Sequence, residues 1–320
     1  NKLNLKEKIS YGFGDFASST FWTLFSMFLL FFYTDVFGLT AAAAGTMFLV
    51  ARLWDTANDP IMGMICERTK TRWGKFRPYL LFGALPFTII GILTFTTPDL
   101  GPTGKLIYAY ITYTLMMMVY TAVNVPYASL LGVMTKNTDE RTSLASFRFI
   151  GGFSAGLMET ATANYLVEYF KTTGDLASAY QKTVAIYAII AGVFFVLTFM
   201  GTKERLDPEE VESSTLKEDL SDLIKNKPWF IMLGAAIAVL VFNSLRGAAI
   251  LFYFKYFIGD QTILYFGEVT QGALASAFMS SGFATSLIGV ALAIPVATRI
   301  GKKNTFMLSG IICAVLCTIF

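Results

Sequence analysis

Two carboxylates stand four residues apart in an apolar stretch, and this pattern indicates chemistry more directly than any other in the sequence. The stretch reads RLWDTANDP from Arg52 to Pro60. In a helix, Asp55 and Asp59 share a face, and Asn58 lies beside them. Two like charges in a medium of low dielectric constant repel each other strongly, unless a cation or a proton lies between them.

The oxygen atoms of this stretch suit a small monovalent cation. Pro60 has no N–H to donate to the carbonyl of Thr56, so a free carbonyl oxygen lies near both acids. Two carboxylates, an amide and a carbonyl are hard ligands that favour Na⁺, Li⁺ or a proton. We predict a cation site at Asp55, Asn58 and Asp59. The alternative is an ion pair between the first aspartate and the preceding arginine that only holds helices together.

A second helix interrupted by proline reads YTAVNVP from Tyr120 to Pro126. Thr121 and Asn124 share a face, and the proline frees the carbonyl of Ala122. We predict that Thr121 completes the cation site, and that Tyr120 and Asn124 face a substrate. The alternative is that the threonine and the asparagine are interhelical hydrogen-bonding groups, which are common in membrane bundles.

Four more side chains complete the predicted substrate site. Asp15 and Ser19 are one turn apart on the first apolar helix, and Trp22 lies on the same side with an aromatic face for a substrate. Arg148, on the fifth apolar segment, offers fork-like donors to hydroxyl or carboxylate groups. The alternative for Arg148 is a simple ion pair with an acid of the first or second helix.

The composition places these residues in a membrane. Hydrophobic residues make up 55% of the chain, charged residues 15%, and the mean hydropathy is +0.58. A bilayer core of about 30 Å needs about 20 apolar residues per helix. Nine such segments recur: Phe13–Tyr33, Ala41–Met64, Tyr79–Thr97, Leu106–Met134, Leu144–Phe170, Val184–Gly201, Trp229–Phe257, Thr270–Thr298 and Thr305–Phe320. We predict an all-α membrane protein with about nine transmembrane helices, and we expect its last bundle to be incomplete, since the final segment has no polar flank.

Charged residues inside these segments are costly and by default mark function. Each costs about 2.5–3.5 kcal/mol at the bilayer centre on insertion scales. They are Asp15, Arg52, Asp55, Asp59, Arg148, Glu159 and Arg246. Three positive and four negative charges leave a net charge of −1, which one bound monovalent cation would neutralise.

The loops between the segments fix an orientation. If the N-terminus is cytoplasmic, the cytoplasmic loops hold 18 Lys and Arg residues and the opposite loops hold four. The positive-inside rule therefore predicts a cytoplasmic N-terminus. Because topology explains the basic runs, we predict no nucleic-acid partner. The lysine-rich Asn1–Ile9 does not resemble a cleavable signal peptide.

The composition also disfavours most enzymes. Histidine is absent, and Cys66, Cys313 and Cys317 give no disulfide framework. A zinc site and a Ser-His-Asp triad are therefore disfavoured. The hydrophilic loops lack the acid motif that a membrane-embedded glycosyl transferase would need. We predict no enzyme and no covalently bound cofactor. For a receptor or scaffold, nine spans with a half-repeat argue against the seven-helix plan.

The chain divides into two related halves. We predict a six-helix bundle at 1–201, a cytoplasmic loop at 202–228, and a partial bundle with helices seven to nine at 229–320. Within the loop, the capping-box spacing at Thr215 precedes apolar residues at helical intervals, which predicts a short amphipathic helix over 216–224. The pattern R-x-G-K occurs at Arg72 and again at Arg299, after the second helix of each half. Duplicated six-helix halves are typical of major facilitator transporters.

The sequence resembles the glycoside–pentoside–hexuronide:cation symporters, to which the melibiose permease belongs. The likeness rests on YGFGD at Tyr11, FYTDVFGL at Phe32, the run from Phe48 to Gly63, and RWGKFRP at Arg72. The strings NVPY and FRF, around the predicted Asn124 and Arg148, extend it along essentially the whole chain. It implies a major facilitator fold of two six-helix bundles, the second incomplete here, and alternating access.

The resemblance also implies roles for individual residues. Asp55, Asn58, Asp59 and Thr121 match the cation-site positions of the family, and Asn124 and Arg148 match positions that contact sugar. The chain departs from the melibiose branch, which has aspartates at the positions of Ser19 and Asn124 and a tryptophan at Ala128. Asp15, one turn earlier, is the expected substitute.

The departures point away from melibiose, so the expected cargo is another glycoside or a pentoside, carried with Na⁺ or H⁺. We expect a monomer in the inner, cytoplasmic membrane. In this hypothesis the cation removes repulsion between the acids, and it thereby stabilises the conformation that binds sugar between the two halves.

Overall fold

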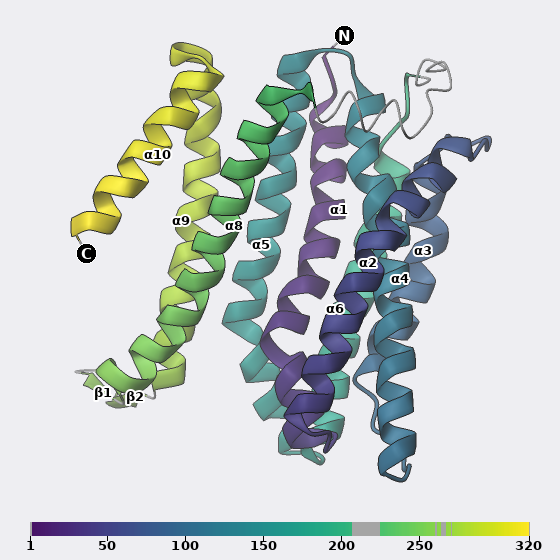
Figure 1. The fold of residues 1–320 in the computed structure, drawn as a ribbon, viewed down its shortest axis with the longest axis vertical. Coiled ribbons are helices and arrows are strands. Elements are labelled where there is room, and N and C mark those ends of the chain that lie inside the picture. The colour runs from purple at the N-terminus through teal and green to yellow at the C-terminus, as the bar shows by residue number, and fades with distance from the viewer. Residues whose placement is uncertain (1, 207–224, 260, 264–266, 270, 320) are drawn as a thin grey trace. The chain divides into compact units, whose positions relative to one another are not determined.

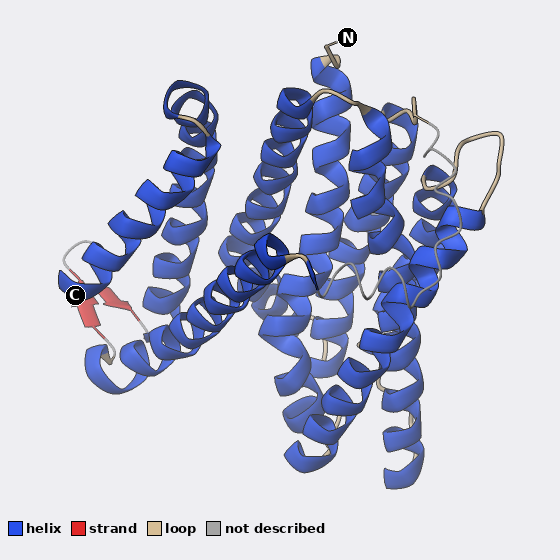
Figure 2. Cartoon of the chain, turned by 45° about the horizontal axis from the view of Figure 1, so that its top comes forward, coloured by secondary structure: helices blue, strands red, loops and turns tan. Residues whose placement is uncertain are grey.

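The computed structural model describes residues 2–206, 225–259, 261–263, 267–269 and 271–319, and nearly all of them are helical (Figure 2). The α-helices are α1 Leu5–Leu24, α2 Ala41–Arg68, α3 Arg77–Thr94, α4 Pro102–Met134, α5 Thr138–Lys171, α6 Leu176–Gly201, α8 Lys227–Tyr253, α9 Gln271–Ile300 and α10 Lys302–Ile319. Three π-helical turns are η1 Phe25–Leu29, η2 Phe32–Val36 and η3 Phe254–Ile258. Two short strands, β1 Gln261–Ile263 and β2 Gly267–Val269, form an antiparallel pair with Thr262 opposite Glu268.

The chain forms two compact units. The first holds Asn1–Leu206 and Ser280–Phe320, and the second holds Asp207–Met279. The first unit contains α1 to α6, which run alongside one another (Figure 1). The second contains α8, η3 and the strand pair. The division at residues 201 and 228 stays a prediction. The predicted amphipathic helix over 216–224 and the side chain of Arg246 lie outside the described residues.

Side chains at the helix starts explain where several helices begin. Asn4, Thr40, Asn137 and Asp175 precede α1, α2, α5 and α6, and each accepts a hydrogen bond from a backbone N–H of the first turn. Such caps satisfy N–H groups that have no partner inside the helix. The cap at Asn4 starts α1 eight residues before the apolar segment that we predicted.

Glycines with positive φ recur at matching places in the two halves of the sequence. The first helix continues through η1 and η2 to Gly38, with φ of 84°, and α8 continues through η3 to Gly259, with φ of 65°. The glycines of the two R-x-G-K loops, Gly74 and Gly301, have φ of 108° and 85°. Residues with a Cβ rarely adopt this conformation, so each loop requires its glycine. This repetition of backbone geometry supports the internal duplication seen in the sequence.

Small residues bring α1 and α5 into close contact. Among α1 to α6, α1 packs on α5 and α6, α3 packs on α4 and α6, and α2 packs on α4 (Figure 1). A Cβ at Gly151 would overlap the carbonyl oxygen of Gly12, and a Cβ at Gly12 would lie 2.6 Å from the carbonyl oxygen of Phe147. Close backbone approach at small residues is a common way for membrane helices to associate.

Four described helical segments are long and apolar enough to cross a membrane by length and composition alone. They are Arg77–Thr94, Pro102–Met134, Leu176–Gly201 and Leu274–Ile300. The N-terminal helices α1, α2 and α5 fall outside this set. They carry charges that we singled out, and charged residues lower the mean hydropathy of a helix. The count of nine spans therefore stays a prediction. The strand pair was not predicted, because three-residue strands are too short to show an alternating pattern.

Candidate functional site

A hydrogen bond between α2 and α4 joins two of the predicted cation ligands. The hydroxyl of Thr121 donates to Oδ1 of Asp59 at 2.9 Å, and Thr121 is buried. Asp55 lies within electrostatic reach of Asp59, and its Oδ1 is buried with no hydrogen-bond partner among the described residues. Asn58 is half-buried on the same helix. An unpartnered buried carboxylate oxygen is costly unless a donor or a cation reaches it.

Arg52 neutralises this pair only weakly. Its guanidinium nitrogen lies 4.0 Å from Oδ2 of Asp55, at the limit of an ion pair, and its side chain is 52% exposed. The same guanidinium lies 4.4 Å from the centroid of the Trp22 ring on α1. A cation over an aromatic face is attracted by the ring electrons. The ion pair that we considered as an alternative therefore exists in a loose form.

The acid on α1 is in a different state, because it has an arginine partner in direct contact. Nε of Arg148 on α5 donates to Oδ1 of Asp15 at 2.7 Å. This is the pairing with a helix-one acid that we considered as the alternative for Arg148. A Cβ at Gly152 on α5 would lie 2.7 Å from Oδ2 of Asp15 and 2.9 Å from Oγ of Ser19. Asp15 and Ser19 therefore both face the glycine surface of α5.

Two tyrosines that we did not predict support this ion pair. The hydroxyl of Tyr127 donates to the backbone carbonyl of Tyr11 at 2.8 Å, and their rings stack with centroids 4.9 Å apart. The guanidinium of Arg148 lies 5.4 Å from the Tyr127 ring centroid. The YGFGD string contains the one local indication of this contact, because Gly14, which has no side chain, leaves the space that the Tyr127 ring fills.

Tyr120 lies between the two groups of charges. It accepts a hydrogen bond from the amide of Asn124, one turn along α4. Its ring centroid lies 6.1 Å from that of Trp22. Tyr120 is within electrostatic reach of Asp15, Arg148 and Arg52. The predicted substrate residues on α1, α4 and α5 are thus connected through contacts around Trp22, Tyr120 and the ion pair.

The cation ligands that we predicted include only two carboxylates. In the described part of the chain, no group of three or more His, Cys, Asp or Glu side chains is placed to hold a metal ion. Two carboxylates, an amide and a hydroxyl are hard oxygen ligands, and four such groups are fewer than the six to eight oxygens that Ca²⁺ takes.

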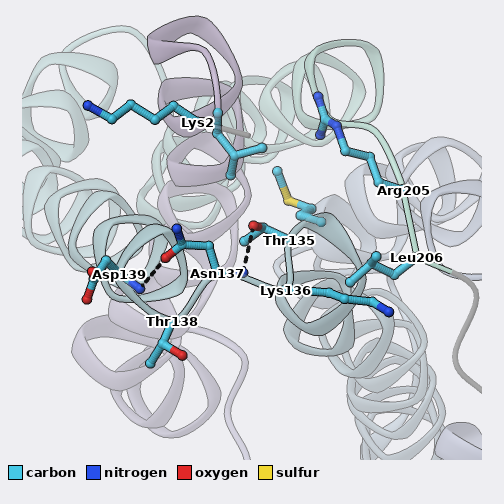
Figure 3. Close-up of a pocket in the computed structure, with 10 residues that line it drawn as sticks. Lys2, Thr135, Lys136, Asn137, Thr138, Asp139, Arg205 and Leu206 are labelled. Carbon is cyan, nitrogen blue, oxygen red and sulfur yellow. Dashed lines mark hydrogen bonds between the residues drawn. The ribbon is translucent and has the colours of Figure 1, made fainter.

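A cavity of about 1000 Å³ lies at one end of the first unit, away from these residues (Figure 3). Lys2, Lys136 and Arg205 line it, and Asn137, which also lines it, accepts a hydrogen bond from the N–H of Asp139 (Figure 3). None of the ten predicted site residues lines this cavity. It is therefore not the substrate site that the sequence predicts.

A glutamate that we did not predict orders the R-x-G-K loop of the first half. Glu204 accepts hydrogen bonds from the backbone N–H groups of Lys75, Phe76 and Arg77, at 2.8–2.9 Å. A carboxylate at a helix N-terminus satisfies unpaired donors and favours the helix dipole. A Cβ at Gly74 would overlap this carboxylate, so the glycine serves both the turn and the contact. Nothing local in the sequence links residues 74 and 204.

A family model described as MFS/sugar transport protein matches residues 10–320. The chain therefore belongs to the MFS/sugar transport protein family, and its curated relatives place it among the glycoside–pentoside–hexuronide:cation symporters. The family consists of transporters, which confirms the prediction that the protein is not an enzyme.

Two curated relatives illustrate the likeness. The chain is 38% identical over 315 residues to the inner membrane symporter YicJ of Escherichia coli (strain K12), covering 98% of this chain and 65% of YicJ. It is 40% identical over 279 residues to the putative glycoside/cation symporter YagG of the same organism, covering 87% of this chain and 60% of YagG. The chain thus spans less than two thirds of the length of either relative.

A solved structure shows the same fold at low sequence identity. The proton:xylose symporter XylE, bound to 6-bromo-6-deoxy-D-glucose, matches with a TM-score of 0.56 and 13% identity. The match covers 93% of this chain and 70% of XylE. At this identity the likeness concerns the fold alone. It confirms the predicted all-α major facilitator architecture.

Proposed function

We propose that this protein is a secondary active sugar transporter, which carries a glycoside or pentoside together with Na⁺ or H⁺ by alternating access. One observation carries the proposal. The hydroxyl of Thr121 on α4 binds Asp59 on α2, beside a second carboxylate, Asp55, that has an unpartnered oxygen and only a distant arginine. Carboxylates in that state suit an exchangeable small cation. The relatives that are named as symporters support the same proposal.

The proposed cation ligands are Asp55, Asn58, Asp59 and Thr121. They come from two helices, so the cation holds α2 and α4 together when it is bound. Li⁺ fits the same hard oxygen ligands. Binding also removes the repulsion between the two acids, which favours the conformation in which α2 and α4 are close.

The proposed sugar ligands are Asp15, Ser19, Trp22, Tyr120, Asn124 and Arg148. Sugar hydroxyls both donate and accept hydrogen bonds, and the Asp15–Arg148 pair offers acceptor and donor atoms side by side. Trp22 is 38% exposed and offers an aromatic face to the C–H groups of a sugar ring.

Coupling between the two sites follows from their connection. Trp22 contacts Arg52 on α2 and Tyr120 on α4, so the helices that hold the cation also position a sugar ligand. If the cation raises the affinity for sugar, then sugar raises the affinity for the cation by the same factor. Only the doubly occupied carrier then moves to release both ligands on the other side.

The proposed setting is a multi-pass monomer in the inner, cytoplasmic membrane, with the N-terminus in the cytoplasm. The distribution of 18 basic residues against four supports this orientation. Lys8, which belongs to the basic N-terminal segment, pairs with Glu140 at the start of α5 at 2.9 Å. The hydrogen bond from Lys8 lowers the pKa of the Glu140 carboxyl below its ordinary value.

Uptake by the full-length protein in proteoliposomes tests the function. A panel of labelled glycosides and pentosides is offered, with a Na⁺ gradient and a pH gradient imposed in separate experiments. We expect concentrative uptake of at least one sugar with one of the two gradients, and none without a gradient. Equal uptake in all conditions would show a carrier without coupling. Absence of uptake for the whole panel with either gradient would contradict the proposal.

A further inference from the structure

Glu159 is a buried acid in the first unit that the proposed mechanism does not use. It lies on α5, and its exposed fraction is 0%. Both of its carboxyl oxygens are buried and have no hydrogen-bond partner among the described residues. Buried ionised groups are almost always paired, so an isolated carboxylate in this position would be an exception.

The groups around Glu159 supply no positive charge. The hydroxyl of Thr23 on α1 is in reach of its carboxyl group, although the contact is too loose to count as a hydrogen bond. On α6 the titratable group within reach is Tyr187, whose hydroxyl is already hydrogen-bonded to Thr162 at 2.7 Å.

The basic residues that precede and follow Glu159 on α5 are too far away to neutralise its charge. Arg148 and Lys171 lie roughly 16 Å and 18 Å from Glu159 along the axis of α5, at 1.5 Å per residue. Arg148 is in addition committed to Asp15 at 2.7 Å. No Lys or Arg of the described residues is an electrostatic partner of Glu159.

A buried carboxyl group without a cation avoids the cost of ionisation by holding a proton. The protonated form has one O–H donor, and the hydroxyl of Thr23 is an acceptor of suitable chemistry. Glu159 lies on α5, which packs on α1 and α6 within the first unit, and Ser280 of α9 donates a hydrogen bond to the neighbouring Thr160. The environment is therefore that of a neutral acid, in contrast to Asp15 and Asp55, which each have an arginine within 4.0 Å.

We propose that Glu159 is a proton-binding site, separate from the Asp55–Asp59 pair, which stays loaded while the cation site fills and empties. Its ligand is a proton and not a metal ion, because one carboxyl group with a single threonine hydroxyl in reach on α1 cannot replace the water around a metal ion. A sugar transporter of this kind holds one proton that does not take part in coupling.

Infrared spectroscopy of the full-length protein at neutral pH tests this site directly. A protonated carboxyl group has a carbonyl band apart from the amide bands, and burial slows its exchange in D₂O. We expect this band in the wild type, its loss in Glu159→Gln, and its retention in Glu168→Gln, which removes an acid from the same helix whose side chain is 70% exposed. No band in the wild type, or an unchanged band in Glu159→Gln, would overturn the proposal.

Folding and uptake of the Glu159→Gln variant give a second reading. A glutamine is close in shape to a neutral glutamic acid, so we expect the variant to fold and to retain gradient-driven uptake within about 2-fold of the wild type. A variant that misfolds or loses uptake would show that a neutral side chain of this shape cannot replace Glu159, which contradicts a site that stays protonated. The infrared measurement needs neither sugar nor gradient, so its result does not depend on the proposed transport function.

Discussion

The acids on α2 and the acid on α1 lie in the same bundle but in different electrostatic states. Asp15 is in direct contact with Arg148 at 2.7 Å. On α2, Asp55 has an arginine nitrogen only at 4.0 Å, and Asp59 has a hydroxyl at 2.9 Å. The first acid has a fixed cationic partner, and the other two do not.

This difference assigns the two kinds of ligand. An acid with a resident arginine presents fixed donors and acceptors, which suit the hydroxyl groups of a neutral sugar. Two acids without such a partner attract a mobile cation, because their repulsion is relieved only when a positive charge arrives. We expect substitutions at the two places to separate binding of the cation from binding of the sugar.

The largest effect is expected for Asp59→Asn. This change removes one of the two charges and weakens the attraction for a cation. We expect the cation to lose its stimulation of sugar binding, by up to about 100-fold, which is within the usual range of coupling between sites. The measurement is concentrative uptake and downhill exchange in proteoliposomes. Accumulation should disappear while some downhill exchange remains.

Asp99→Asn is the matched control for that variant. Asp99 is exposed and lies outside the helices, between α3 and α4. The Asp99→Asn variant should accumulate sugar like the wild type. Unchanged accumulation in Asp59→Asn would show that the acids of α2 do not bind the coupling cation, and the assignment of different ligands to α1 and α2 would then be wrong.

The next largest effect is expected for the difference in coupling energy between the two ion pairs, which double-mutant cycles measure. Asp15→Asn with Arg148→Gln should show a coupling energy of about 1.5–3 kcal/mol, as expected for a hydrogen bond between charged groups. Arg52→Gln with Asp55→Asn should show no more than about 1 kcal/mol, as for an exposed pair. Unfolding of each variant in detergent measures these energies. Equal coupling at the two places would show that Arg52 is a true partner of Asp55.

Gly152→Ala tests the sugar side without changing a charge. The new methyl group would lie 2.7 Å from Asp15 and 2.9 Å from Ser19, so these side chains must move. Such overpacking costs about 1–3 kcal/mol. We expect weaker sugar binding and unchanged cation binding, measured by titration of the purified protein. Gly132→Ala, where a Cβ meets open space, is the control and should bind both ligands normally.

The smallest effect is expected for Thr121→Val, which keeps the shape but removes the hydroxyl. Loss of one hydrogen bond costs about 1 kcal/mol, so the cation concentration for half-maximal stimulation should rise about 5-fold. Thr121→Ser keeps the donor and should behave like the wild type. If the valine variant responds to the cation normally, Thr121 is not a ligand and only links α2 to α4.

The sequence was sufficient to predict the family, the fold class and the faces that the site residues share. Helical spacing predicted that Asp55 and Asp59 lie together, and in the structure they are within electrostatic reach of each other. The proline-containing run on α4 was expected to lie near them, and Thr121 contacts Asp59. Whether these residues bind a cation stays a prediction, as do the roles of the sugar residues.

Contacts between distant positions could not be read from the sequence. Gly152 faces Asp15, and Glu204 binds the loop around Gly74, more than a hundred residues away in each case. No periodicity or local motif encodes such pairs. The start of α1 at Leu5 was missed for a different reason, since hydropathy cannot detect a polar first turn that a cap at Asn4 stabilises. Conversely, the bare count of charges inside helices did reveal Glu159.

The contact between Gly12 on α1 and Gly151 on α5 has a mechanical consequence. With backbones this close, the two helices cannot slide past each other without a clash. We therefore expect α1 and α5 to move together as one rigid body. In the proposed transport cycle, Asp15 and Arg148 would then keep their separation in every step. A sugar would meet this pair already assembled on either side of the membrane, and the opening and closing would have to come from other helices.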